Sequence, residues 1–336
     1  MSLFFLFCFL FLFLFFFLLF SCEVSCTDEP TNPQAIIQPT VSQWRFDSEA
    51  AYVIAGGLGA MGRIIARWMA SKGARHLVLL SRSGPRPGDS EVIAFIQELE
   101  TTGTTIYHPA CDISNPDSLA QALDHCIHRG MPPIKGCIQA AMVLRDGFFD
   151  NLDHADWSES LIPKMDGSWN LHQQLPRDLD FFILLSSVSG IFGSHGQSNY
   201  ATANTFQDEL ARYRVETLGE RAISIDLSLV GGEGFSVQHP ELAQQLLRTK
   251  HIVEMKQEEM LGVLDRVCGP YEADDPLPYQ IVMGLDLPKN AVARGMDLPA
   301  WMQDPMFANL HQLDVLQSPS DGDDVPGENG AQGLAG

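Results

Sequence analysis

Basic residues are scarce in this chain. Its 336 residues include 21 Lys and Arg against 42 Asp and Glu, which gives a net charge of −21 at pH 7. Binding to nucleic acid depends on positive charge that neutralises phosphates, so this balance argues against a nucleic acid partner. A hydrophobic fraction of 45%, with 28 Gly and 20 Pro, is ordinary for a globular enzyme, and the length allows two domains.

Cysteines are few, and their spacing does not indicate a metal site. There are seven, and only Cys22 and Cys26 are closely spaced, so no metal site is predicted. The cysteines between Cys111 and Cys137 lie in apolar stretches, where a thiol usually behaves as a small core residue. This pattern favours a reducing compartment, and we expect the catalytic body to be cytoplasmic.

A long hydrophobic run occurs only at the N-terminus. Leu3 to Phe20 consists of Leu and Phe except for Cys8, and as a helix it would reach about 27 Å, close to the thickness of a hydrocarbon core. No basic residue precedes Arg45, so neither the positive region of a signal peptide nor a positive-inside bias is present. A membrane anchor, a cleaved signal and a non-native leader all stay open. If the chain contacts a membrane, we expect it to do so only through this run.

The predicted organisation has four parts. A hydrophobic leader at 1–20 and a polar, Pro-punctuated linker at 21–47 precede the folded body at 48–310. An acidic, flexible tail follows at 311–336. Within the body, residues 297–310 are a candidate to pack back on the preceding elements.

Short apolar runs of the buried-strand type alternate with longer stretches of helical spacing. The predicted strands are Tyr52–Ala55, His76–Leu80, Thr105–His108, Ile134–Gln139, Phe181–Leu185, Ala222–Leu227 and Gln280–Met283. Between the strands, apolar residues recur three and four positions apart, as at Ile64, Ile65, Trp68 and Met69. Parallel strands need crossover connections, so this alternation predicts an α/β fold with a doubly wound parallel sheet of the Rossmann type.

A glycine-rich loop joins the first predicted strand to the first predicted helix. Gly57, Gly59 and Gly62 give the pattern G-x-G-x-x-G in that context. Glycines allow a tight turn and let main-chain amides approach a pyrophosphate at the helix N-terminus. The predicted cofactor contacts in this loop are Gly56, Gly57, Leu58, Gly59 and Gly62.

The residues after the second and third strands indicate which dinucleotide binds. A NAD site usually has an acid after the second strand, whereas this chain has Ser81 and Arg82. A guanidinium binds a 2′-phosphate that an acid would repel, so NADPH is the predicted cofactor. Asp112 and Ile113 follow the third strand, where they can reach the adenine. An N-cap or Asx turn would also explain Asp112.

A serine, a tyrosine and a lysine form the predicted catalytic group. Ser187 ends the fifth strand, and Tyr200 follows thirteen residues later, with Asn204 on the same helical face. Carbonyl reduction needs a proton donor, and a tyrosine with its ordinary pKa of about 10 needs a cationic neighbour. Lys164, expected on the preceding helix, could supply that charge. Each residue alone has an ordinary structural explanation, but together they predict a reductase site.

These motifs resemble the ketoreductase domain of polyketide synthases, in the short-chain dehydrogenase/reductase superfamily, and most of all the fungal highly reducing type. The resemblance covers about Ser48 to Leu310. In most of the superfamily lysine follows tyrosine by four positions and asparagine precedes both. Here Lys164 comes before Tyr200 and Asn204 comes after it, as in synthase ketoreductases.

The resemblance implies a role for each residue. Tyr200 would donate a proton, Ser187 would hydrogen-bond the substrate carbonyl, and Asn204 would hold a relay water or the lysine. Lys164 would bind the nicotinamide ribose and tune Tyr200, and Tyr200 is itself a predicted cofactor contact. The implied reaction is NADPH-dependent reduction of a β-ketoacyl thioester to the β-hydroxyacyl thioester, with an acyl carrier protein or other synthase domains as partners. A free-standing dehydrogenase for a small ketone or alcohol and a noncatalytic synthase fragment stay open.

Several positions depart from the family pattern. Ala55 and Ala60 replace a common threonine and glycine, and both still permit a usable loop. Residues 139–142, Gln-Ala-Ala-Met, stand where His-Ala-Ala-Gly is more usual beside the nicotinamide. Asp146 matches the final acid of the Leu-Asp-Asp motif, which is linked to one product configuration, and Phe192 stands where the opposite class has tryptophan. These two positions favour the Leu-Asp-Asp class.

Overall fold

Seven parallel strands form the centre of the structure. The computed structural model describes residues 43–86, 88–232, 252–270 and 277–311, together with positions 237, 241, 243, 244 and 247. The sheet order is β3-β2-β1-β4-β5-β6-β7, and every neighbouring pair is parallel. The strands are β1 (Ala51–Ala55), β2 (His76–Leu80), β3 (Thr105–Tyr107), β4 (Ile134–Gln139), β5 (Phe181–Ser187), β6 (Ile223–Leu227) and β7 (Gln280–Val282). The predicted doubly wound α/β sheet is confirmed.

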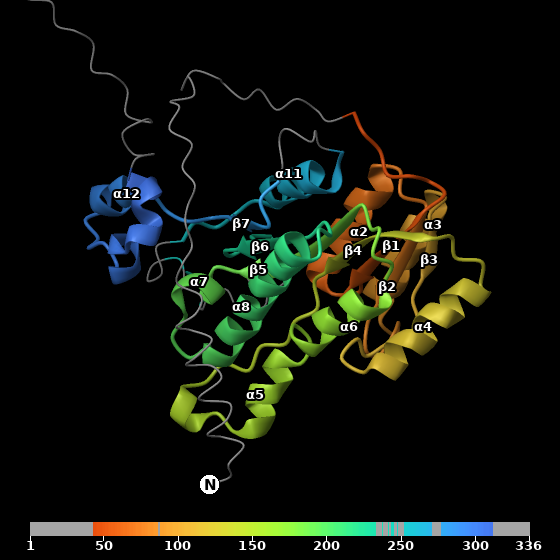
Figure 1. The fold of residues 1–336 in the computed structure, drawn as a ribbon, viewed down its shortest axis with the longest axis horizontal. Helices are drawn as coiled ribbons and strands as arrows, with labels where there is room; N and C mark the ends of the chain where they lie inside the picture. The colour runs from red at the N-terminus through yellow and green to blue at the C-terminus, as the bar shows by residue number, and fades with distance from the viewer. Residues whose placement is uncertain are drawn as a thin grey trace, which may run out of the picture. The chain divides into compact units, whose positions relative to one another are not determined.

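Helices connect the strands and cover both faces of the sheet (Figure 1). They are α2 (Ala60–Ser71), α3 (Ser90–Thr101), α4 (Pro116–His128), α5 (His154–Leu161), α6 (Asp166–Gln174), α7 (Ser189–Phe192), α8 (Ser198–Arg212), α11 (Gln257–Cys268) and α12 (Pro288–Ala293). Single turns occur at η1 (Phe149–Asn151), η2 (Tyr213–Thr217), η3 (Ala300–Gln303) and η4 (Pro305–Phe307). Local sequence sets the helix starts. For example, the Asn115 side chain accepts two backbone N–H groups at the start of α4, whose first residue is a proline.

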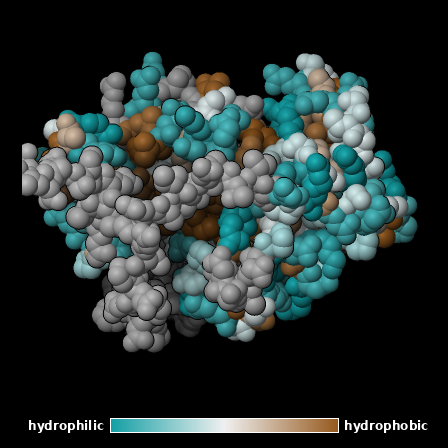
Figure 2. Space-filling view, turned by 90° about the horizontal axis from the view of Figure 1, so that it is seen from above, coloured by the Kyte–Doolittle hydropathy of each residue, from teal (hydrophilic) through white to brown (hydrophobic). Residues whose placement is uncertain are grey.

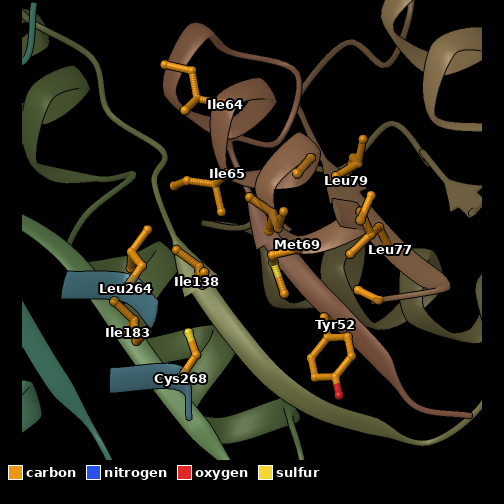
Figure 3. Packing of buried hydrophobic residues seen from close by; sticks show 14 of the residues in the cluster. Tyr52, Ile64, Ile65, Met69, Leu77, Leu79, Ile138, Ile183, Leu264 and Cys268 are labelled. Atoms are coloured by element: carbon orange, nitrogen blue, oxygen red, sulfur yellow. The ribbon is translucent and has the colours of Figure 1, made fainter. Parts of the chain in front are cut away.

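Two apolar cores lie on opposite faces of the sheet. Side chains alternate along a strand, so Ile54 of β1 enters the core shared with α2, α3 and α11, and Val53 enters the core shared with α4, α6 and α8. Figure 3 shows the first core, where Met69 of α2 approaches Ile138 of β4, and Leu264 of α11 lies beside the strands. Apolar side chains therefore pack against both faces of the sheet.

The folded body starts earlier than the sequence predicted. Phe46 is only 6% exposed and packs edge-on against Tyr52, with ring centroids 4.9 Å apart. The indole N–H of Trp44 donates to a backbone carbonyl of α11, and the Lys72 ammonium lies over the indole ring. The predicted linker at 21–47 is thus wrong at its end, because packing the buried Phe46 and the partly buried Trp44 against the body offsets the entropy lost by ordering this segment.

The C-terminal segment packs back on the body, as residues 297–310 suggested. Met302 is fully buried, and Phe307 is nearly so. The hydrophobic leader at 1–20, most of the linker and all but the first residue of the tail lie outside the described residues.

No helix in the described ranges combines the length and apolarity needed to cross a bilayer. On the face seen in Figure 2, hydrophobic residues form small separate patches among hydrophilic ones.

Candidate active site

A cleft of about 600 Å³ opens at the carboxyl ends of the strands. The sheet order reverses between β1 and β4, and the crevice at such a point is where open α/β sheets bind their ligands. Residues that follow β1, β2, β4, β5 and β6 all contribute to its walls. The cleft is therefore the candidate site.

The glycine-rich loop forms one end of this cleft. Gly56, Gly59 and Gly62 line it, whereas Gly57 and Leu58 do not. Gly56 has φ +77°, and a Cβ at Gly62 would clash with the Gly56 carbonyl oxygen, so the close turn requires glycine at both positions. Helix α2 begins beside the cleft with no side-chain cap at Gly59, which leaves its first N–H groups available to a phosphate. This loop fits a dinucleotide.

The residues predicted to choose the cofactor border the same cleft: Ser81, Arg82, Asp112 and Ile113. Arg82 is exposed, and it has no ion-pair partner within the described part of the chain. The buried Ser81 hydroxyl also has no hydrogen-bond partner among the described residues. Both groups are suited to hold phosphate or ribose oxygens.

The carboxylate of Asp112 makes a local turn. Its Oδ1 accepts from the N–H and the hydroxyl of Ser114, at 3.0 Å and 2.6 Å. The Asx turn that the sequence left open is therefore formed, while Asp112 also borders the cleft.

The tyrosine, serine and lysine of the predicted catalytic group line one part of the cleft. Ser187 is the last residue of β5, and Tyr200 is in the first turn of α8. The Lys164 Nζ lies 5.6 Å from the centre of the Tyr200 ring. The Tyr200 hydroxyl lies 3.8 Å from the sulfur of Met142, in the loop after β4. The fold thus brings a hydroxyl, a phenol and an ammonium together.

Lys164 does not lie on a helix, which corrects the prediction. Helix α5 ends at Leu161 and α6 begins at Asp166, so Lys164 lies in the turn between them. The reason is Pro163, which lacks an N–H and cannot continue the ladder of α5. The turn directs the ammonium inward, where Lys164 is only 2% exposed.

Burial sets the protonation of the lysine. Burial lowers the pKa of Lys164 to about 7, although the charges of Asp208 and Asp226 oppose this shift. These two acids are themselves buried under the site, on α8 and β6. Burial and the neighbouring Asp208 raise the pKa of Asp226 to about 8. Burial also raises the pKa of Tyr200, and the side chains of Asn204 and Ser187 act in the opposite direction.

Asn204 is fully buried and does not line the cleft. Its Nδ2 donates to the carbonyl of Tyr200, one helical turn earlier, at 2.7 Å. Its Oδ1 has no partner among the described residues. The lysine is held instead by the carbonyl of Leu185 and the side chain of Gln207. The predicted role of Asn204 as a holder of the lysine has no contact to support it, and its relay role stays a prediction.

Several cleft residues carry no recognisable sequence signal. They include Gln197, Leu229, Val230 and Ile252, which follow strands or lie in loops without a motif. Gln207, behind the cleft, carried a usable signal, because it follows Tyr200 by seven positions and so shares its helical face.

The family model described as KR domain matches residues 50–232. The chain is 44% identical over 278 residues to highly reducing polyketide synthase 40 of Fusarium mangiferae, covering 80% of this chain and 11% of that protein. It is 43% identical over 275 residues to reducing polyketide synthase pksF of Alternaria solani, covering 81% and 12%. The chain thus spans about a tenth of the length of these relatives.

Solved ketoreductase structures are similar in fold to this chain. An A1-type ketoreductase superposes with a TM-score of 0.62 at 30% identity, over 70% of this chain and 48% of that one. The ketoreductase from the first module of phoslactomycin biosynthesis in Streptomyces sp. HK803 superposes with a TM-score of 0.58 at 28% identity, over 66% of this chain and 51% of that one.

Proposed function

The chain belongs to the ketoreductase (KR) domain family of polyketide synthases, and on this premise we propose that it reduces a β-ketoacyl thioester to the β-hydroxyacyl thioester with NADPH. One observation carries the proposal. Lys164, Ser187 and Tyr200 line the same cleft as the uncapped glycine loop. A nicotinamide cofactor, which this family uses, supplies the hydride when bound.

Side chains of the protein bind and protonate the carbonyl oxygen of the substrate. The Ser187 hydroxyl donates a hydrogen bond to that oxygen and fixes the carbonyl in the cleft. The Tyr200 hydroxyl donates its proton to the same oxygen as the carbon is reduced, and Tyr200 then recovers a proton from solvent. The positive charge of Lys164, 5.6 Å from the ring centre, stabilises the phenolate and holds the ribose hydroxyls.

NADPH is preferred over NADH because of the residues after β2. Arg82 is exposed at the cleft, and a guanidinium pairs with a 2′-phosphate through charge-assisted hydrogen bonds. The absence of an acid beside it removes the usual partner of an unmodified ribose.

The lining of the cleft supports an acyl substrate. Its wall after β6 and β4 is apolar, with Leu229, Val230, Val143 and Leu144, and this suits an acyl chain. We assign an acyl carrier protein, or another synthase domain that carries the thioester, as the partner. The buried cysteines, free in the described part of the chain, fit a reducing cytoplasm.

The test compares substrates that share one acyl group. Purified protein is given NADPH with a β-ketoacyl pantetheine thioester, with the same acyl group on a carrier protein, or with a free ketone of similar size. We expect NADPH oxidation to be fastest with the carrier-bound thioester. Preference for the free ketone would indicate a free-standing dehydrogenase. NADPH binding without oxidation by any substrate would indicate a noncatalytic fragment.

A further inference from the structure

A buried chain of hydrogen bonds runs behind the cleft from the lysine to the loop after β4. The Lys164 Nζ donates to the side-chain carbonyl of Gln207 at 2.8 Å and to the backbone carbonyl of Leu185 at 2.6 Å. The Nε2 of Gln207 donates to the hydroxyl oxygen of Ser168 at 3.0 Å. The Nε2 of Gln139 donates to the same oxygen at 3.3 Å.

Gln139 extends this series of hydrogen bonds to a residue that lines the cleft. Its side-chain carbonyl accepts from the Ala141 N–H at 2.5 Å, and its Nε2 also donates to the Pro163 carbonyl at 2.8 Å. Ala141 lines the cleft, and Pro163 precedes the lysine. Gln139 therefore ties the loop after β4 to the turn that carries Lys164.

The partners fix the orientation of both amide side chains. The Ala141 N–H can only donate and the Pro163 carbonyl can only accept, which orients Gln139. An ammonium has only donors, so Gln207 presents its carbonyl to Lys164 and its NH₂ to Ser168. Gln139, Ser168 and Gln207 are all fully buried. Breaking one link would leave a polar group unpaired in the interior, which costs about tenfold or more in an equilibrium constant. The chain of bonds is thus held in a single arrangement.

Gln207 links the lysine to the rest of this hydrogen-bond network. The turn at residues 162–165 fixes the backbone of Lys164, but its side chain is long and flexible. Asp208 of α8 and Asp226 of β6 attract the ammonium only when they are ionised, and burial raises the pKa of both. Their side chains accept hydrogen bonds from Ser224 and Gln280 instead. Gln207 supplies the side-chain acceptor in direct contact with the ammonium.

We propose that Gln207 is a positioning residue, which holds the ammonium of Lys164 beneath Tyr200 and, through Ser168 and Gln139, couples it to the loop that borders the cleft. The inference rests on the proposed function, in which Lys164 supports Tyr200 and holds the ribose. Gln207 itself touches neither substrate nor cofactor.

The test replaces Gln207 with two side chains of nearly equal size. Gln207→Met keeps the volume and removes the acceptor. Gln207→Glu keeps the acceptor for Lys164 and adds a charge, and the Ser168 hydroxyl can donate to the new carboxylate in place of the lost NH₂ contact. Loss of a hydrogen bond to a charged group lowers kcat in Gln207→Met by about 10- to 100-fold, and the KM for the thioester changes less. Gln207→Glu restores kcat to within a few-fold of the wild-type value. Gln97→Met, on the exposed side of α3, serves as the matched control.

The pH profile separates positioning from a merely structural role. Because the ammonium form of Lys164 is the working form, kcat declines as the pH rises through the lysine pKa. Loss of an acceptor disfavours the ammonium form of Lys164, so the decline of kcat begins at a lower pH in Gln207→Met. A nearby carboxylate favours the ammonium form, so the decline of kcat begins at a higher pH in Gln207→Glu. Opposite shifts support the proposal, and equal profiles in the three folded proteins would overturn it.

Cofactor affinity gives a readout that does not depend on turnover. NADPH binding, followed by fluorescence titration, weakens by about tenfold in Gln207→Met and recovers in Gln207→Glu. If the wild-type protein reduces no ketone, the proposed function fails while this titration still tests Gln207. If Gln207→Met does not fold, the pH profile of kcat in Gln207→Glu is the test. A decline that begins at a higher pH than in the wild-type protein supports the proposal, and an unshifted profile overturns it.

Discussion

The indole ring of Trp301 stacks on the phenyl ring of Phe192, with ring centroids 4.5 Å apart and planes inclined by 9°. Phe192 lines the cleft, whereas Trp301 comes from η3, near the end of the described chain. Phe307 packs edge-on against the same indole at 4.8 Å. The C-terminal segment therefore fixes the position of one wall of the site.

Trp301→Ala is expected to raise the KM for the thioester several-fold with little change in kcat. An aromatic pair contributes about 0.5–1.5 kcal/mol beyond the area it buries, and without it Phe192 is free to move, while Tyr200 and Lys164 are untouched. Steady-state kinetics measure both constants. Met306→Ala, at an exposed position of η4, is the control, and an unchanged KM in Trp301→Ala would show that the wall does not contact substrate.

Tyr200→Phe is expected to lower kcat by about 10²- to 10⁴-fold, as for loss of a general acid. The ring stays in place, so NADPH affinity should change by less than about threefold, since only one hydroxyl is lost. Rates with a saturating thioester measure the effect, and Tyr213→Phe, at a partly exposed tyrosine outside the cleft, is the control. Full turnover in Tyr200→Phe would rule out the proton-donor role.

Arg82→Gln is expected to lower kcat/KM for NADPH by about ten- to hundredfold, the size of a lost hydrogen bond to a charged group. The value for NADH should hardly change, because NADH has no 2′-phosphate. Arg86→Gln, an exposed arginine in the same loop, is the control. Equal losses with both cofactors would assign Arg82 a role other than phosphate binding.

Gly62→Ala is expected to abolish dinucleotide binding, because the added Cβ would clash with the Gly56 carbonyl oxygen and deform the loop. Calorimetric titration with NADPH measures the loss. Gly262→Ala is the control, because nothing lies within 4 Å of its added Cβ. That exposed helical position should instead gain about 0.5–1 kcal/mol of stability.

Asp226→Asn is expected to flatten the dependence of stability on pH. The pKa of Asp226 is raised to about 8, so between pH 4 and pH 8 the folded state keeps a proton that the unfolded state releases. The free energy of unfolding therefore falls as pH rises through this window, by on the order of 1 kcal/mol per pH unit. Urea unfolding at several pH values should show a smaller fall in Asp226→Asn than in the wild-type protein or in the exposed variant Asp124→Asn.

Much of the fold could be predicted because its signals are local. Each strand of the sheet is an apolar run, and the observed bounds of β2 and β4 match the predicted ones. The glycine loop was recognisable because its steric requirement falls within seven consecutive residues. Ser187 and Tyr200 stood out because the end of a strand and the start of a helix place them at one sheet edge.

The remainder depended on contacts between distant residues. The stacking of Trp301 on Phe192 joins positions more than one hundred residues apart, and no periodicity encodes it. Lys164 was expected on the helix before β5, but Pro163 prevents α5 from continuing and leaves Lys164 in the turn before α6. The hydrogen bond from Lys164 to Gln207 exists only because a turn and a helix meet behind the cleft, so composition and spacing could not reveal it.

The position of helix α11 limits how far this chain can be truncated. The family model stops at residue 232, yet Met260, Leu264 and Val267 beyond it are fully buried in the core shared with α2 and the central strands. A recombinant piece trimmed to the matched range would leave that side of the sheet bare to water and make β6 an open edge. Such a piece would tend to aggregate, so expression work should retain the chain at least to the end of β7.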